Sequence, residues 1–109
     1  MAVIEANDKN FDELIQGEYA MVDFYGEHCG ACVFTAPYFR AAAEEMAFID
    51  FIKVNTSIYP SLAKRFDIKG LPTFIYFEKG KQVHQSVGGL DEKMLKKQVA
   101  EMLYGNRDK

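Results

Sequence analysis

The two cysteines of the chain, Cys29 and Cys32, form one Cys-x-x-Cys unit inside the stretch VDFYGEHCGACVF at residues 22 to 34. Redox-active dithiols and metal centres both use this spacing. A helix is predicted to begin near Cys29, and a cysteine at a helix start lies where free N–H groups and the helix dipole stabilise a thiolate. Cys29 is therefore the predicted nucleophile. Cys32, one turn further on the same helix face, is within reach of a disulfide to Cys29 and is expected to be less exposed.

A dithiol of this kind can carry out thiol–disulfide exchange. Cys29 attacks a substrate disulfide, a mixed disulfide forms, and Cys32 resolves it. Cys32 has to lose a proton in that step. Asp23 lies in the middle of the apolar run YAMVDFY, where burial is expected to raise its pKa and make it a proton acceptor. The alternative is a solvated aspartate at a strand end that takes no part in the reaction.

Length and composition indicate a soluble globular protein. The 109 residues, with 49% apolar and 27% charged side chains, predict one domain over residues 1–109. The net charge of -3, with no strong basic cluster, argues against nucleic acid or an anionic membrane as partner. Because the sequence shows no signal-like segment and no long apolar run, we expect a cytoplasmic protein. In that compartment a cysteine pair is more often catalytic, redox-sensing or metal-binding than a structural disulfide.

The hydrophobic pattern predicts five strands and four helices that position these residues. Strands are expected at 2–6, 19–25, 48–55, 73–78 and 81–87, and helices after Asn7, from Cys29 to Met46, around 61–66 and after Asp91. Asn7 and Asp91 are the predicted N-caps. Gly80 supplies the turn of a terminal antiparallel hairpin. The order β-α-β-α-β-α-β-β-α predicts a three-layer α/β fold, with a central mixed sheet flanked by helices on both faces.

The segment VDFYGEHCGAC resembles the active-site segment of the thioredoxin family, whose usual form is V-D-F-W-A-x-W-C-G-P-C. The order of elements resembles the thioredoxin fold over essentially the whole chain. Pro37 falls where the family kinks the active-site helix, and Lys53 falls where the family has a lysine near the buried aspartate. The segments GLPT at 70–73 and VGGL at 87–90 match the cis-proline segment and the glycine turn before the last helix.

This resemblance implies further roles. It implies a cis Leu71–Pro72 bond opposite the cysteines, with the Leu71 backbone offering strand-like hydrogen bonds to a substrate peptide, and Gly88 at the same substrate surface. It also implies protein substrates that contain disulfides, a redox-active disulfide without bound cofactor, and a reductase partner that supplies electrons from NADPH through FAD. We expect a monomer.

The chain departs from the family pattern around the cysteines. His28 and Tyr25 replace tryptophans, and Ala31 replaces the proline between the cysteines. Ala31 restores an N–H in the first helical turn, expected to point towards the Cys29 sulfur, and a donating His28 would stabilise the thiolate further. We therefore assign tuning of the redox potential to His28, Gly30, Ala31 and Lys53, and predict a couple more oxidising than a typical thioredoxin. Alternatively, His28 is only a solvated surface residue.

Two other functions stay open at this stage. A closed zinc site needs four ligands, and the only other nitrogen or sulfur candidates are His28, adjacent to Cys29, and His84, far along the chain in the hairpin. A metal that bridges two chains through paired Cys-x-x-Cys units is a further possibility. The second alternative is a non-catalytic module that binds proteins through the GLPT face, since a fold alone does not imply activity. A pure scaffold, however, has no chemical need for Asp23 and Lys53 beside both cysteines.

Overall fold

The apolar run around Asp23 forms the middle strand of the sheet, as predicted. This strand, β2 (Tyr19–Tyr25), lies between β3 (Asp50–Asn55) and β4 (Thr73–Glu78) in the computed structural model, which describes residues 2–104. Five of its seven residues are buried. A strand covered on both faces has to be apolar on both, which explains the continuous apolar run.

The remaining elements follow the predicted order. They are β1 (Val3–Glu5), α1 (Phe11–Leu14), α2 (Gly30–Glu45), α3 (Pro60–Arg65), β5 (Lys81–Val87) and α4 (Glu92–Leu103). The sheet order is β1-β3-β2-β4-β5. The pairs β1–β3 and β3–β2 are parallel, whereas β2–β4 and β4–β5 are antiparallel. The predicted mixed sheet with an antiparallel hairpin at one edge is confirmed.

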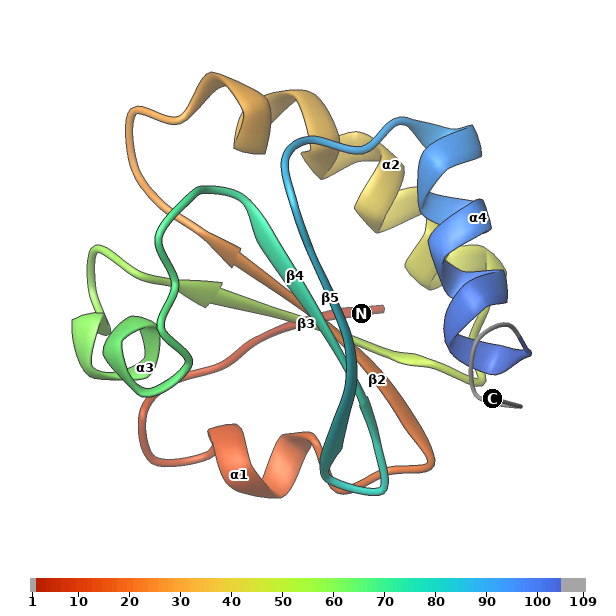
Figure 1. The fold of residues 1–109 in the computed structure, drawn as a ribbon, viewed down its shortest axis with the longest axis horizontal. Helices are drawn as coiled ribbons and strands as arrows, with labels where there is room; N and C mark the ends of the chain where they lie inside the picture. Colours follow the sequence, from red (N-terminus) through yellow and green to blue (C-terminus); the bar gives the residue numbers. More distant parts are fainter. Residues whose placement is uncertain (1, 105–109) are drawn as a thin grey trace.

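Helices cover both faces of this sheet (Figure 1). On one face, α2 and α4 pack Phe39 and Leu95 against Phe51 and Phe74 of the sheet. On the other face, α1 and α3 pack through a second cluster that includes Phe11 and Leu62. The three-layer arrangement predicted from the pattern is therefore present. Within residues 2–104, no helix combines the length and apolar character needed to cross a membrane.

The first helix differs from the prediction. The sequence predicts that Asn7 caps a helix beginning directly after it, but α1 is a single turn that starts at Phe11, with Asn10 as the N-cap residue. The Asn7 side chain instead accepts hydrogen bonds of 2.8 Å from the N–H groups of Lys9 and Asn10. These local side-chain bonds compete with helix formation and delay the helix by one turn. The strand predicted from 48 also begins later, at Asp50.

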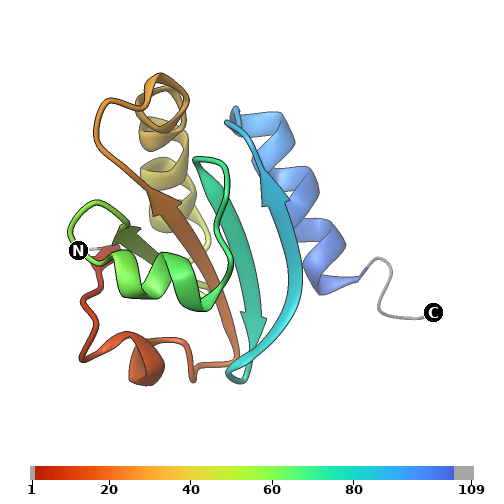
Figure 2. The same cartoon turned by 60° about the vertical axis from the view of Figure 1, so that its left-hand side comes forward.

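The segments singled out in the sequence lie together at one end of the sheet. The start of α2, the loop before β4 and the turn between β5 and α4 meet at this end (Figure 2). The loop before β4 and the turn after β5 are joined directly, because the N–H of Gly88 donates a 2.8 Å hydrogen bond to the carbonyl of Pro72. The fold therefore brings residues 29–32, 70–73 and 87–90 to one place.

Candidate active site

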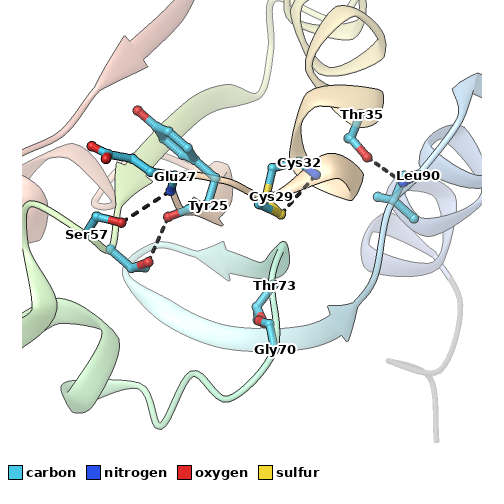
Figure 3. Close-up of a disulfide and its surroundings, with 10 residues drawn as sticks. Tyr25, Glu27, Cys29, Cys32, Thr35, Ser57, Gly70, Thr73 and Leu90 are labelled. Atoms are coloured by element: carbon cyan, nitrogen blue, oxygen red, sulfur yellow. Dashed lines mark hydrogen bonds between the residues drawn. A yellow bond between two sulfur atoms is a disulfide. The ribbon is translucent and has the colours of Figure 1, made fainter.

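The structure joins Cys29 and Cys32 in a disulfide at the N-terminus of α2, with their Cα atoms 5.3 Å apart. Cys29 has extended backbone geometry and is the N-cap residue, with its sulfur accepting a 3.2 Å hydrogen bond from the N–H of Cys32 (Figure 3). Cys29 is partly exposed, whereas Cys32 is buried, with 7% of its surface accessible. An outer sulfur at a helix N-terminus and a buried second sulfur are the arrangement that exchange chemistry requires.

The residues around the sulfurs only partly follow expectation. The hydrogen bond to the Cys29 sulfur comes from Cys32 and not from Ala31, the donor expected from the sequence. Ala31 and Gly30 are exposed in the first turn of α2. His28 is also exposed, has a positive φ of 58°, and makes no hydrogen bond to the sulfurs among residues 2–104. His28 lies beside Cys29 and lines the cleft next to the disulfide.

Asp23 is buried on the α2 side of the sheet. Its side chain shares a face with that of Met21, two residues earlier, which packs against the helices α2 and α4. Only 1% of the Asp23 surface is accessible, and its Oδ1 has no hydrogen-bond partner within the described part of the chain. Burial raises the pKa of Asp23 to about 7, with Lys53 opposing the shift and Glu5 adding to it. The carboxyl group can therefore take up and release a proton near neutral pH.

Lys53 lies beside Asp23 in the sheet, in register across β2 and β3. Its ammonium group does not form an ion pair with a carboxylate of residues 2–104 within 4.0 Å, and lies instead 4.3 Å from the centroid of the Tyr25 ring. The Tyr25 hydroxyl donates to both carboxylate oxygens of Glu5, each at 3.1 Å. Burial and the Glu5 carboxylate raise the pKa of Tyr25 to about 12. Glu5 is not among the residues predicted from the sequence.

The segment GLPT contains the cis peptide bond expected from the resemblance, between Leu71 and Pro72. Leu71 is 36% exposed, and its backbone makes no hydrogen bond to another described residue. The loop lies against the chain leaving β2, because a Cβ atom at Gly26 would come within 2.7 Å of Leu71 Cδ1. A larger residue at Gly26 would therefore require the Leu71 side chain to move.

A second contact that sequence reasoning missed fixes the helix that carries the cysteines. The buried Thr35 hydroxyl accepts a 2.7 Å hydrogen bond from the N–H of Leu90 (Figure 3). Next to it, a Cβ atom at Gly89 would come within 3.2 Å of the Thr35 hydroxyl and 3.3 Å of the Ala31 carbonyl oxygen. The glycine turn after β5 thus packs directly on the first turns of α2. A threonine inside a helical pattern gives no sequence signal for such a contact.

An open cleft of about 560 Å³ lies beside the disulfide. Its walls include Tyr25, His28, Cys29, Cys32, Val33 and Lys53. Among residues 2–104, no group of three or more histidine, cysteine or acidic side chains is arranged to hold a metal ion. His84 lies in β5, in ring contact with Tyr76, and the structure does not bring it to the cysteines.

A mixed sheet in this strand order, a disulfide at the start of α2, a buried acid behind it and a cis-proline loop at the same end define a thiol–disulfide oxidoreductase. The family model described as Thioredoxin matches residues 2–101. The chain belongs to the thioredoxin family. The family expected from the active-site segment is thereby confirmed.

Similar proteins include members from distant organisms. The chain is 36% identical over 97 residues to thioredoxin Y, chloroplastic, of Oryza sativa, covering 86% of this chain and 58% of that protein. It is 34% identical over 91 residues to thioredoxin of Chlamydia muridarum, covering 84% of this chain and 89% of that one. Among solved structures, a mutant thioredoxin from Halobacterium salinarum superposes with a TM-score of 0.85 at 25% identity, covering 94% of this chain and 91% of that one.

Proposed function

We propose that the chain exchanges its Cys29–Cys32 couple with disulfides of protein substrates, with Asp23 as the proton acceptor. The observation that carries the proposal is the partly exposed Cys29 at the N-terminus of α2, in a disulfide with the buried Cys32, while Asp23 lies buried on the sheet face that α2 covers. Each residue thereby has the exposure that its step needs: access for the attacking sulfur and seclusion for the proton acceptor.

In the reducing direction the reduced protein begins as a Cys29 thiolate and a Cys32 thiol. The thiolate attacks one sulfur of the substrate disulfide, and the other substrate sulfur leaves as a thiolate that takes a proton from solvent. Cys32 then transfers its proton to the Asp23 carboxylate and attacks the Cys29 sulfur, which releases the second substrate thiolate. Two electrons pass to the substrate, and the Cys29–Cys32 disulfide remains.

The substrate peptide is proposed to bind along Leu71, Pro72 and Gly88. Support comes from the exposed Leu71, whose backbone groups have no partner among the described residues, and from the bond that fixes Gly88 to Pro72. An extended peptide can pair with such free backbone groups as an added strand. Because the fold brings this loop and the cysteines to one end of the sheet, a bound disulfide would lie near Cys29.

The couple is proposed to be more oxidising than that of a typical thioredoxin. Ala31 leaves an N–H in the first turn of α2 where proline would have none, and His28 lies next to Cys29. In the disulfide form neither group donates to the Cys29 sulfur, so the proposal is that they donate to the thiolate of the reduced protein. Donors that stabilise the thiolate stabilise the reduced form and raise the potential. Equilibration with glutathione measures it: a value clearly above about -270 mV, the thioredoxin reference, is expected. A value at or below that reference would refute this part.

We further propose that the oxidised protein is recharged by a flavoprotein reductase that draws on NADPH. Such recharging keeps Cys29 and Cys32 as free thiols, which is the state expected in a reducing compartment such as the cytoplasm. The chain itself is proposed to act as a monomer without a bound cofactor. Consumption of NADPH by a mixture of this protein, a thioredoxin reductase and a disulfide substrate tests the partnership. Consumption no faster than with the reductase alone would show that another electron donor is used.

Reduction of insulin by dithiothreitol, followed by turbidity, tests the central proposal. The unaltered chain is expected to accelerate the reaction, and Cys29→Ser is expected to return it to the rate without protein. Equal rates for the two proteins would favour a module that only binds partners. Metal analysis of the purified chain addresses the remaining alternative, since a stoichiometric metal released by oxidation of the cysteines would indicate a bridging site.

A further inference from the structure

Glu5 occupies the same row of the sheet as Asp23. The registers Glu5↔Lys53 and Asp23↔Lys53 place one residue each from β1, β3 and β2 side by side. Residues in register on neighbouring strands share a face, and neighbouring strands lie about 4.8 Å apart. The two carboxyl groups therefore flank Lys53 at a separation of roughly 10 Å, taken as two strand spacings.

Tyr25 spans this row. It lies two residues after Asp23 and thus on the same face, and its hydroxyl reaches across to the Glu5 carboxylate with two 3.1 Å contacts. The Lys53 ammonium group lies against the ring of the same tyrosine, 4.3 Å from its centroid. A cation over an aromatic ring is attracted by the ring's negative face. The tyrosine thus fixes the positions of both neighbouring charges.

A cavity of about 220 Å³ reaches this cluster from the β1 edge of the sheet. It is lined by Val3, Glu5, Ala36, Phe39, Arg40 and Lys53. The charged groups on this side of Asp23 are therefore Glu5 from β1, Lys53 from β3 and the exposed Arg40 from α2. On the β4 side the neighbour in register is the apolar Phe74, and the nearby Tyr76 hydroxyl donates to Gln98.

We propose that Glu5 is a positioning residue of the exchange reaction, which, held by the Tyr25 hydroxyl, offsets the Lys53 ammonium group and thereby makes the Asp23 carboxylate a stronger acceptor for the Cys32 proton. This inference rests on the proposed function, in which Asp23 handles the proton of Cys32. A carboxylate roughly 10 Å from Asp23, in a medium of effective dielectric about 20 to 40, raises the pKa of Asp23 by roughly one unit. The Glu5 charge acts in the direction that raises the pKa of Asp23.

The test is an NMR titration of the Asp23 carboxyl carbon in the oxidised protein without substrate. Glu5→Gln removes the charge from an exposed position and keeps the shape, so the fold should be retained. We expect the titration midpoint of Asp23 to fall by roughly one unit. The matched control, Glu13→Gln, removes the same charge from an exposed site on α1, on the other side of the sheet. Equal midpoints in the two variants would overturn the proposal.

A second variant separates positioning from charge alone. Tyr25→Phe keeps the ring under Lys53 and the charge of Glu5 but removes the hydroxyl that holds the carboxylate. With Glu5 free to turn into solvent, the midpoint of Asp23 is expected to fall in the same direction by a smaller amount. A midpoint equal to that of the unaltered chain would refute the positioning role of Tyr25.

The pH profile of disulfide reduction links the cluster to the reaction. The measured quantity is the rate at which the reduced protein reduces a model disulfide, as a function of pH. In Glu5→Gln the fall of this rate at acid pH is expected to move to lower pH, by the same shift as the Asp23 midpoint. A profile that stays in place while the carboxyl midpoint moves would overturn the catalytic part. The carboxyl titration needs no substrate turnover, so it can be read even if the proposed oxidoreductase activity is not found.

Discussion

Asp23 and Lys53 are direct neighbours across β2 and β3, yet the lysine ammonium lies over the Tyr25 ring and leaves Asp23 Oδ1 without a partner among the described residues. A buried carboxylate that is hydrogen-bonded and paired has a low pKa, whereas a buried carboxyl without these partners keeps its proton. Asp23 and Lys53 therefore do not form a stabilising ion pair, and Asp23 remains a group that titrates in the physiological range. This relationship has a measurable consequence for stability.

Replacement of Asp23 by asparagine is expected to raise the free energy of unfolding at neutral and alkaline pH. The pKa of Asp23 is raised from 3.8 to about 7 in the folded state. As pH rises through that interval, the unfolded chain loses this proton while the folded chain keeps it, so stability falls. At about pH 8 the gain in Asp23→Asn should be roughly 3 kcal/mol or more, and at about pH 4 it should be small.

Urea denaturation of the oxidised proteins at both pH values measures this difference. Asp8→Asn, at an exposed site, serves as the control and should change stability little at either pH. A gain in Asp23→Asn that is the same at both pH values would show that titration of this carboxyl is not its cause.

Cys32→Ser is expected to trap the reaction after its first step. Cys29 can still attack a substrate disulfide, but without the second sulfur the mixed disulfide cannot be resolved within the protein. Mass spectrometry should show a covalent adduct with the substrate, and turnover should fall to the rate without protein. Cys29→Ser should give no adduct, because the buried Cys32 is poorly accessible. An adduct of similar yield in Cys29→Ser would reverse the assigned roles.

Ala31→Pro is expected to make the couple more reducing. The substitution removes one N–H from the first turn of α2, where proline is otherwise tolerated. In the disulfide form this N–H makes no hydrogen bond to the Cys29 sulfur, so the prediction concerns a bond to the Cys29 thiolate that forms on reduction. A hydrogen bond to a charged group contributes about 1.5 kcal/mol, which corresponds to a fall in potential of roughly 30 mV, or about tenfold in the equilibrium with glutathione. Ala31→Ser keeps the N–H and should leave the potential near that of the unaltered chain. Equal potentials in both variants would rule out the Ala31 donor.

Thr35→Val is expected to destabilise the fold by about 1 to 3 kcal/mol, because the N–H of Leu90 would be left buried without an acceptor. Both the threonine hydroxyl and the amide are buried, and their 2.7 Å bond joins residues 55 positions apart. Thr35→Ser keeps the hydroxyl and should lose much less. Thermal unfolding compares the loss of the hydrogen bond, which Val removes, with the loss of the methyl group, which Ser removes. A loss in Thr35→Val no larger than that in Thr35→Ser would contradict a dominant role of the hydrogen bond.

Local patterns are enough to predict most of the fold. The apolar run around Asp23, the Gly80 turn and the Asp91 cap are short-range signals, and the structure has β2, the β4–β5 hairpin and an Asp91 side chain that accepts from the N–H of Met94. The predicted start of α1 is wrong because the Asn7 side chain satisfies two backbone donors in a turn that propensity alone does not distinguish from a cap.

The parts of the site that sequence reasoning missed are long-range contacts. Glu5 meets Tyr25 only because the register places β1 beside β3 and a tyrosine on β2 reaches across it. Thr35 meets Leu90 through the packing of α2 on the turn before α4. A local hydrophobic period encodes neither strand register nor packing between layers. The cysteines can therefore be predicted from their spacing, whereas the residues that contact their helix and the buried acid cannot.

The Leu90 amide also reports on the contact between α2 and the turn before α4. Its hydrogen is held by a side chain of the cysteine-bearing helix, while its backbone belongs to the turn that continues from Gly88. It can exchange with solvent only when helix and turn separate. The exchange rate of this one amide, compared between the oxidised and reduced protein, therefore records how firmly α2 and the turn before α4 are held together in each redox state.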